Sequence, residues 1–428
     1  MMRSMYSGVS GLRVHQTKMD VIGNNISNVN TAGFKSSRVT FSEVFSQTLQ
    51  GASGANAATG RGGTNPMQIG LGVDVASIDN IMTEGASQRT DNPLDLKIEG
   101  EGFFIVDDGT GPKFTRAGAF RPDDFGNLVT PEGYRVMGWP VDGNNDIQQG
   151  MVEPLSIMSP QNLYSDPEAT TDVYVEGNID LNDPQLATDN GVPFTFNFYD
   201  NLGYRYTAEF NIVEDGDNYQ IGLTNIYNSN GDPIDENDMP DFDLELEFDA
   251  TNGRVVGDGL GELNGLVNAA GEEFGDINID FSSLTLFSGN TNIDAHRGDQ
   301  DGYGAGSAAG TLSGYSVGPD GIILGTYTNG DVKNLGQIVI TEFRNPSGLE
   351  KIGNNLFAAT NNSGEFDGIG MDPTANGGSL NGGVLEMSNV DLSQEFTEMI
   401  TTQRGFQANS RTITTTDEML QELVNLKR

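Results

Sequence analysis

The stretch SNVDLSQEFTEMITTQRGFQANSRTITTTDEMLQELVNLKR, residues 388–428, carries a seven-residue apolar repeat. The repeat is formed by Leu392, Met399, Phe406, Ile413 and Leu420, and Phe396 and Val424 flank it at its two ends. Ser388 followed by Asp391 resembles a capping box, so we expect a helix that begins near Ser388 and runs almost to Arg428. One thin apolar row on a polar helix predicts packing against another helix.

Residues 4–30 repeat this pattern more weakly. Apolar residues occupy one seven-residue row and the row beside it, namely Met5, Leu12, Met19 and Ile26, then Val9, Ile22 and Val29. Gly8, Gly11 and Gly23 each weaken a helix by about 1 kcal/mol relative to alanine. A partner is therefore needed to order this helix. His15 falls on its polar side, where we expect a surface or inter-subunit contact.

The two terminal helices leave two interpretations open. They can pair within one chain and merely close the fold, or they can form a coiled coil that buries its remaining surface against other subunits. Two helices alone cannot cover all the large apolar side chains of the second one, which include Met399, Ile400, Phe406, Ile413, Leu420 and Leu423. The intermolecular interpretation is favoured, and it predicts polymerisation.

The segment NNISNVNTAGFK, residues 24–35, follows the pattern of the first helix. Asparagine and glycine cap helix ends and tolerate a left-handed backbone. We therefore expect the helix to stop and the chain to turn at Asn24, Asn25, Asn28, Asn30 and Gly33. The asparagine amides can also bond neighbouring backbone groups, but the sequence does not show which ones.

Composition favours several domains that are rich in strands and turns. The 428 residues exceed one ordinary core, so two to four domains are expected. Only 36% of residues are apolar and 57 are glycine, which favours β architecture over a helical bundle. Cysteine is absent, which excludes disulfides. The sequence has neither an apolar run of about 18 residues nor the apolar core of a signal peptide, so we expect no membrane insertion and no cleaved signal.

The formal charge of −39 is concentrated in the middle of the sequence. Residues 1–50 hold five basic residues against two acidic ones, a net charge of +3. Residues 150–300 hold three arginines against 30 acidic residues, a net charge of −27. Such a segment repels DNA phosphate and anionic lipid, so no nucleic-acid partner is expected.

Strand patterns fill this acidic segment. FTFNFYDNLGYRYTAEFNI alternates aromatic and polar residues around a turn near Asn201–Gly203, which predicts a hairpin. DFDLELEF alternates acidic and apolar residues, which predicts a strand with one solvent face and one core face.

Motifs for catalysis or metal binding fail on inspection. GYSVG at 314–318 fits a nucleophile elbow, but that motif needs a downstream histidine, and both His15 and His296 precede it. The acidic runs DPIDENDMPDFD and GDQDG lack the register of a twelve-residue calcium loop. We therefore expect no enzyme, no catalytic residue, no metal site and no cofactor. The alternative from another class is a secreted acidic module that binds a ligand or Ca²⁺.

Two stretches resemble the terminal motifs of the bacterial flagellar rod and hook proteins. They are SGVSGLRVHQTKMDVIGNNISNVNTAGFK near the start and LEMSNVDLSQEFTEMITTQRGFQANSRTITTTDEMLQELVNLKR at the end. The inner flanks NPLDLKIEGEGFFIV and DGIILGTYTNGDVKNLGQIVITEFRNPSGLEKIGNNLFAAT resemble the same family. A long insert separates these flanks, which resembles the hook proteins rather than the shorter rod proteins. A distal rod-type protein is the runner-up.

The resemblance implies a mostly β chain of the α+β class, with two stacked β domains nested between terminal helices. The terminal helices would form a coiled-coil-like inner layer, and their apolar rows would carry self-assembly. The implied parts are terminal helices at 1–30 and 388–428, an extended connector at 31–72, a discontinuous β domain at 73–147 and 298–387, and an inserted acidic β domain at 148–297.

The resemblance also implies a function and a set of partners. The chain would be a self-assembling structural subunit of a flexible curved tube, a universal joint that transmits torque from the rod to the filament. Implied partners are further copies in a helical homopolymer, the distal rod protein, the hook cap protein, the hook–filament junction protein and the flagellar type III export apparatus. The implied location is extracellular, in the flagellar hook and basal body.

Overall fold

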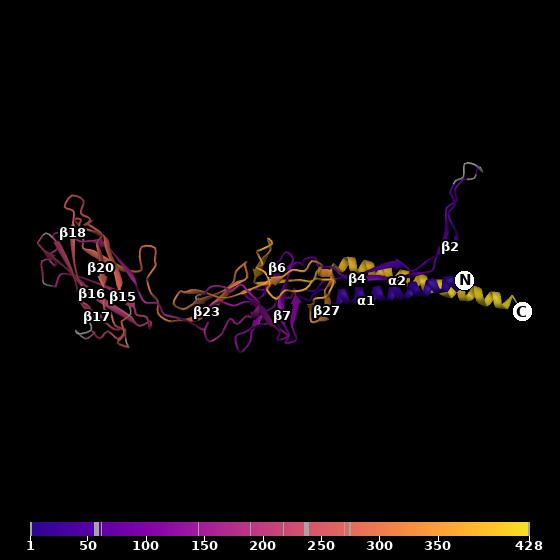
Figure 1. Ribbon diagram of the computed structural model, residues 1–428, viewed down its shortest axis with the longest axis horizontal. Coiled ribbons are helices and arrows are strands. Elements are labelled where there is room, and N and C mark those ends of the chain that lie inside the picture. The colour runs from indigo at the N-terminus through magenta and orange to yellow at the C-terminus, as the bar shows by residue number, and fades with distance from the viewer. Residues whose placement is uncertain are drawn as a thin grey trace. The chain divides into compact units, whose positions relative to one another are not determined.

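The computed structural model describes residues 2–54, 60, 62–143, 145–188, 190–216, 218–234, 239–268, 270–273 and 275–426. The chain divides into two compact units. Unit 1 comprises Met1–Ser159, Tyr315–Leu324 and Lys333–Arg428, and unit 2 comprises Pro160–Gly314 and Gly325–Val332. Figure 1 shows a helix near each end of the chain and strands between them.

Helix α1 spans Met2–Ser27 and helix α2 spans Leu392–Asn425. Asp391 caps α2, because its side chain accepts hydrogen bonds from the backbone N–H groups of Ser393 and Gln394. The prediction that this helix begins near Ser388 is therefore wrong.

Tertiary hydrogen bonds explain the later start of α2. The side-chain amide of Asn389 donates to the carbonyl of Ile81, and its oxygen accepts from the backbone N–H of Ser36. These bonds tie residue 389 to two other segments of unit 1. The residues before Asp391 therefore stay outside the helix, although Ser388 is a good capping residue by itself.

The strands of unit 1 are short. They are β1 (Ser37–Glu43), β2 (Ser46–Gln50), β3 (Met67–Gly70), β4 (Val73–Asn80), β5 (Ser87–Arg89), β6 (Leu96–Glu99), β7 (Phe103–Asp107), β8 (Pro112–Thr115), β9 (Arg121–Pro122), β10 (Leu128–Val129), β11 (Arg135–Trp139), β12 (Glu153–Pro154), β26 (Ile340–Thr341), β27 (Glu350–Gly353), β28 (Leu356–Ala358), β29 (Ser379–Gly382) and β30 (Val384–Glu386), with the 3-10 helix η1 (Pro346–Gly348). Strands β23 (Gly310–Val317), β24 (Ile322–Tyr327) and β25 (Val332–Ile338) have residues in both units.

The core of unit 1 is built on part of a large sheet, in which neighbouring strands are antiparallel and follow the order β25-β11-β7-β8-β28-β27. Strand β7 reads FFIVD, and its first four side chains are buried, as a continuous apolar run predicts. The indole N–H of Trp139 in β11 donates to the carbonyls of Gly150 and Ile369, each at 3.0 Å. The core cluster consists of Phe103, Ile105, Phe114, Trp139, Val339, Phe343, Leu349 and Phe357.

Short two-stranded ladders join distant parts of unit 1. Strand β1 pairs with β4, β2 with β3, β6 with β29, and β5 with β30, all antiparallel. Residues 31–72, predicted as an extended connector, thus contain three strands. Because β30 ends five residues before Asp391, the β5–β30 ladder leads directly into α2.

Unit 2 contains a five-stranded sheet, β15-β16-β17-β18-β19, and a four-stranded sheet, β20-β21-β14-β22. Strand β14 runs parallel to β21, and the remaining neighbours are antiparallel. The strands are β13 (Tyr164–Ser165), β14 (Asp172–Asn178), β15 (Val192–Tyr199), β16 (Arg205–Asp215), β17 (Asn218–Tyr227), β18 (Asp243–Phe248), β19 (Val255–Val256), β20 (Leu260–Leu263), β21 (Ile277–Thr285) and β22 (Asn292–Arg297).

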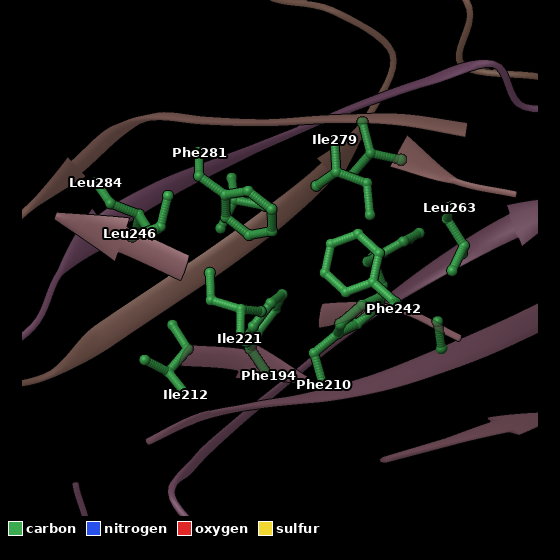
Figure 2. Packing of buried hydrophobic residues seen from close by; sticks show 14 of the residues in the cluster. Phe194, Phe210, Ile212, Ile221, Phe242, Leu246, Leu263, Ile279, Phe281 and Leu284 are labelled. Atoms are coloured by element: carbon green, nitrogen blue, oxygen red, sulfur yellow. The ribbon is translucent and has the colours of Figure 1, made fainter. Parts of the chain in front are cut away.

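An aromatic and aliphatic core joins these two sheets. Figure 2 shows Phe194, Phe210 and Phe281, from β15, β16 and β21, together with Phe242, which directly precedes β18. The predicted hairpin is confirmed, since β15 pairs with β16 up to Tyr199 opposite Arg205. The predicted two-faced strand is confirmed as β18, whose acidic side chains are exposed while Leu246 and Phe248 are buried.

The prediction of a mostly β chain with a helix at each end is confirmed. The finer division of the chain into a helical layer, a connector and two β domains remains a prediction. The two compact units begin and end at other residues, because the division falls at Ser159 and Pro160 and passes through β23, β24 and β25.

Candidate self-assembly site

Helices α1 and α2 lie side by side within unit 1 (Figure 1) and run antiparallel. A Cβ atom at Gly8 would lie 3.1 Å from Cγ1 of Ile413, and one at Gly11 would lie 2.6 Å from Nδ2 of Asn409. Both distances are shorter than ordinary van der Waals contact. Glycine therefore lets the two backbones approach closely here, whereas a Cβ at Gly23 would meet nothing within 4 Å.

The other end of the helix pair is polar. The Lys18 ammonium lies 3.1 Å from a carboxylate oxygen of Glu398. Two turns further along α1, the amide of Asn25 donates to Glu395 at 2.9 Å. Burial raises the pKa of the Glu395 carboxyl; Glu398 adds to this rise, while Asn25 and Lys18 oppose it.

His15, expected in a surface or inter-subunit contact, is half-buried against α2 in the middle of the pair, and its inter-subunit contact remains a prediction. A Cβ at Gly405 would lie 2.7 Å from its Nε2, and its ring centroid lies 6.3 Å from that of Phe41, edge to face. Burial lowers the pKa of His15, and the charge of Lys18 lowers it further. We call the contacting residues the helical seam: Gly8, Gly11, His15, Lys18 and Asn25 of α1, with Glu395, Glu398, Gly405, Asn409 and Ile413 of α2.

The antiparallel β1–β4 ladder packs on α1. The backbone N–H of Val73 donates to the hydroxyl of Ser10 at 3.3 Å. The Lys18 ammonium lies 5.9 Å from the ring centroid of Phe41 in β1. Helix α1 therefore packs against both α2 and the β1–β4 ladder.

The asparagine run fixes the exit of the chain from α1. Asn25 accepts from the backbone N–H of Ser37 at 3.0 Å and donates to the carbonyl of Ser37 at 2.9 Å, in addition to its bond to Glu395. It is 1% exposed. One amide thus joins α1, β1 and α2. Asn24 and Asn25 lie in the last turn of α1, not beyond it.

The rest of the run shapes the turn itself. Asn28 donates to the carbonyl of Asn24 at 2.9 Å and accepts from the Thr31 hydroxyl at 3.1 Å, while Asn30 is exposed. Gly33 has φ of +69°, and a Cβ there would lie 2.6 Å from the backbone nitrogen of Ala117. Only glycine meets both conditions without strain.

The apolar rows predicted to carry self-assembly lie mostly beside the helical seam. In α1, Ile22 is buried, Val9 is exposed, and Met5, Leu12, Met19 and Ile26 are half-buried; Val29, just beyond the helix, is half-buried too. In α2, Leu392, Phe396 and Val424 are exposed, and Met399, Phe406, Ile413 and Leu420 are half-buried. Ile413 alone among them also belongs to the seam. Their role in self-assembly remains a prediction.

Large apolar side chains on both helices are open to solvent. Ile400 is 58% exposed and Val424 is 67% exposed. We call this set the outer apolar surface: Tyr6, Val9, Phe396, Ile400, Met419, Leu423 and Val424. Large apolar side chains left exposed in this number on a pair of helices are a feature of interaction sites. Tyr6 and Met419 escaped the sequence analysis because they lie outside the seven-residue rows.

The described residues contain neither a membrane-spanning helix nor a cluster of metal-binding side chains. Among these residues, no helix is long and apolar enough to cross a membrane. In the same part of the chain, histidine, aspartate and glutamate side chains form no group of three or more placed to hold a metal ion. The acidic run at 232–243 lies partly outside the described residues.

Known families match both ends and part of the middle of the chain. The description "Flagella basal body rod protein" matches residues 5–35, "Flagellar hook protein FlgE/F/G D1 domain" matches residues 97–179, and "Flagellar basal body rod FlgEFG protein C-terminal" matches residues 381–426. The flagellar hook protein FlgE of Borreliella burgdorferi is 40% identical, over 100% of both chains. The chain belongs to the flagellar hook protein family. The resemblance seen in its terminal motifs is thereby confirmed.

Further relatives carry related names. The flagellar hook protein FlgE of Treponema pallidum is 36% identical over 100% of both chains. The flagellar basal-body rod protein FlgG of Bacillus subtilis is 33% identical, also over 100% of both chains. The solved structure of Helicobacter pylori flagellar hook protein FlgE2 has a TM-score of 0.44 at 15% identity, covering 70% of this chain and 100% of that chain. These names place the family in the flagellar hook and basal body.

Proposed function

We propose that this chain is the self-assembling structural subunit of the bacterial flagellar hook, the curved tube that transmits torque from the rod to the filament. The full-length similarity to hook proteins carries this proposal. The helix pair supports it physically, because apart from Ile413 its seam consists of glycines and polar residues, while the outer apolar surface is exposed to solvent. An apolar surface that the chain leaves uncovered gains free energy when further copies cover it.

The proposed assembly has the terminal helices inside and the β units outside. Helices of neighbouring copies would cover the outer apolar surface and hold the tube together. Unit 2 would face outward, and its acidic, polar surface suits interfaces that slip as the tube turns while bent. Large apolar interfaces between such domains would instead resist sliding.

The proposed partners follow from this place in the flagellum. Copies of the chain would contact one another along the tube, the distal rod protein at one end and the hook–filament junction protein at the other. The hook cap protein would act during assembly, and the flagellar type III export apparatus would deliver the chain to its extracellular location. A rod-type axial protein is the second candidate, favoured by the full-length relative in Bacillus subtilis.

Immuno-electron microscopy of intact flagella separates these proposals. The antibody should be raised against residues 160–314, which form most of unit 2. We expect label on the short curved segment between rod and filament. Label confined to the rod would favour the rod-type protein, and label on neither would favour a secreted acidic module.

A further inference from the structure

A buried ion cluster joins three distant segments of unit 1. Lys35 follows the turn after α1, Arg116 follows β8, and Glu386 ends β30 just before α2. Their side chains are 1%, 4% and 0% exposed. None of these three residues belongs to the helical seam or to the outer apolar surface.

Glu386 is the centre of this cluster. One of its carboxylate oxygens lies 2.6 Å from the Lys35 ammonium and accepts from the backbone N–H of Gly85 at 2.9 Å. Its other oxygen lies 3.6 Å from Nη1 of Arg116. Its backbone carbonyl accepts from the N–H of Gly33 at 2.8 Å. One residue therefore links four segments.

The two cations make few other contacts. Lys35 also donates to the carbonyl of Thr83 at 2.7 Å, and Arg116 donates to the carbonyl of Gly100 at 2.8 Å. The Arg116 guanidinium lies 5.4 Å from the ring centroid of Phe103. Nε and Nη1 of Arg116 are buried without a hydrogen-bond partner. The charge of these two groups is therefore balanced mainly by Glu386.

The cluster holds two cations and a single buried carboxylate. Burial lowers the pKa of Lys35 and of Arg116, and Glu386 opposes both shifts. The charge of Glu84 also acts to raise the pKa of both cations, and the charge of Glu101 acts to raise the pKa of Arg116. Glu84, however, is 41% exposed and lies 3.9 Å from Lys97, so it is a weak substitute for a buried counter-charge.

We propose that Glu386 is a completion switch: unit 1 reaches its closed state only when the C-terminal segment places this carboxylate between Lys35 and Arg116. Both cations precede Glu386 in the chain, so a growing chain holds them before their counter-charge exists. Closing the core over two unpaired cations is strongly unfavourable. Because Glu386 lies in β30, its insertion also sets the register of the segment that begins α2. This inference is independent of the proposed role in the hook.

Urea unfolding of the full-length chain tests the switch. Trp139 is the single tryptophan of the chain and lies in the core of unit 1, so its fluorescence follows that unit alone. Glu386→Gln keeps the shape but removes the charge, as in a chain that has not yet delivered Glu386. We expect it to lower the folding equilibrium constant of unit 1 at least about 100-fold. Lys35→Met leaves Arg116 and Glu386 as a balanced pair, so about a tenfold loss is expected.

A double variant and a matched control test whether unpaired cations cause the loss of stability in Glu386→Gln. Lys35→Met combined with Glu386→Gln should be more stable than Glu386→Gln alone, because one of the two unpaired cations is gone. Glu99→Gln is the control, since this exposed carboxylate also binds the C-terminal segment, through Asn381 at 2.6 Å. It should stay within about threefold of the parent.

A pH series adds a readout that a purely structural role would not move. The pKa of Lys35 is lowered in the fold, so between this lowered pKa and the ordinary value of 10.5 the folded state binds fewer protons than the unfolded state. Stability therefore rises with pH in that range. We expect a steeper rise in Glu386→Gln than in the parent, and we expect the double variant to lose it.

Several results would overturn the switch. The first is that Glu386→Gln is as stable as Glu99→Gln, and the second is that the double variant is no more stable than Glu386→Gln. The third is that the stability of unit 1 changes with pH to the same extent in the presence and absence of Lys35. If Glu386→Gln does not fold at neutral pH, restored folding in the double variant supports the proposal. Its failure to fold contradicts the proposal.

Discussion

Unit 2 and the pair of terminal helices place their apolar side chains in opposite ways. In unit 2, Phe194, Phe210 and Phe281 are no more than 5% exposed, and the acidic residues of β18 face solvent. In the helix pair, glycine and polar groups make the seam, while Ile400 and Val424 are more than half exposed.

Unit 2 therefore buries its apolar side chains within the chain, whereas the helix pair leaves several of its apolar side chains exposed. Unit 2 gains its stability from burying its own apolar surface. Several apolar residues of α1 and α2 are only half-buried or exposed, and isolated helices with glycines in their interior are marginal in water. Strands β1 and β4 pack on α1 within the chain, and we propose that further copies supply the remaining stability of the helices.

The largest expected effect comes from breaking the outer apolar surface. Ile400→Asp should abolish assembly, because it places a charge where a neighbouring copy would bury a side chain. Gln403→Asp is the control, since it adds the same charge to the same helix at an exposed polar position. Electron microscopy of the purified proteins at rising concentration should show tubes for Gln403→Asp only. Tubes of Ile400→Asp would mean that this surface is not an interface.

Deleting unit 2 tests whether the helix pair can assemble without it. A short Gly/Ser linker in place of residues 160–314 should leave tube formation intact, since the outer apolar surface lies in unit 1. Tube curvature or stiffness should change, because the layer proposed to slide has gone. Electron microscopy of the tubes measures both. Loss of the tubes themselves would assign unit 2 a role in holding copies together.

A smaller effect comes from filling the helical seam. Gly11→Val should destabilise the helix pair by about 2 kcal/mol, because its Cβ would lie 2.6 Å from Asn409. Gly23→Ala should instead stabilise it by about 1 kcal/mol, since nothing lies within 4 Å of that position. Circular dichroism during heating reports both changes. Equal effects of the two substitutions would show that the glycines do not serve close approach.

The smallest effect tests the polar end of the seam through pH. The pKa of Glu395 is raised above its ordinary value near 4.5, so its contribution to stability is present below that pH and is lost as pH rises through the folded pKa. Burial also acts to raise the pKa of Glu398, but its hydrogen bonds with Lys18 and Gln394 lower it overall. That contribution is lost as pH falls instead.

Glutamine substitutions should therefore act in opposite directions. At pH 7, Glu395→Gln should stabilise the helix pair and Glu398→Gln should destabilise it, each by less than about 1 kcal/mol after solvent screening. Thermal melts at pH 4 and pH 7 measure the two slopes. Changes of the same sign in both variants would contradict the assignment of these contacts.

The sequence predicted elements better than contacts. Periodicity identified both terminal helices, and alternation identified the β15–β16 hairpin and strand β18. The seam was missed because its key positions are Gly8 and Gly11, which appear in a sequence only as weak points of a helix. Large apolar residues dominated the pattern, yet most of them lie beside the seam. A glycine signals close approach only once the partner helix is known.

Other misses have the same origin in distant contacts. Ser388 and Asp391 both suit a helix cap, and the choice between them depends on the bonds of Asn389 to Ile81 and Ser36. Asn25 was identified as important, but its bonds to Ser37 and Glu395 involve segments that the sequence does not bring together. No local pattern encodes such partners.

The most direct test of the central claim is the burial of α2 in the assembled state. The chain has no cysteine, so Ile400→Cys creates a single thiol on the outer apolar surface, and Thr110→Cys creates one at an exposed turn of unit 1. Maleimide labelling of free chains and of assembled tubes compares the two sites. We predict that the thiol at position 400 reacts in free chains and is protected in tubes, while the thiol at position 110 reacts in both. Equal reactivity of position 400 in both states would contradict the claim that further copies cover this surface.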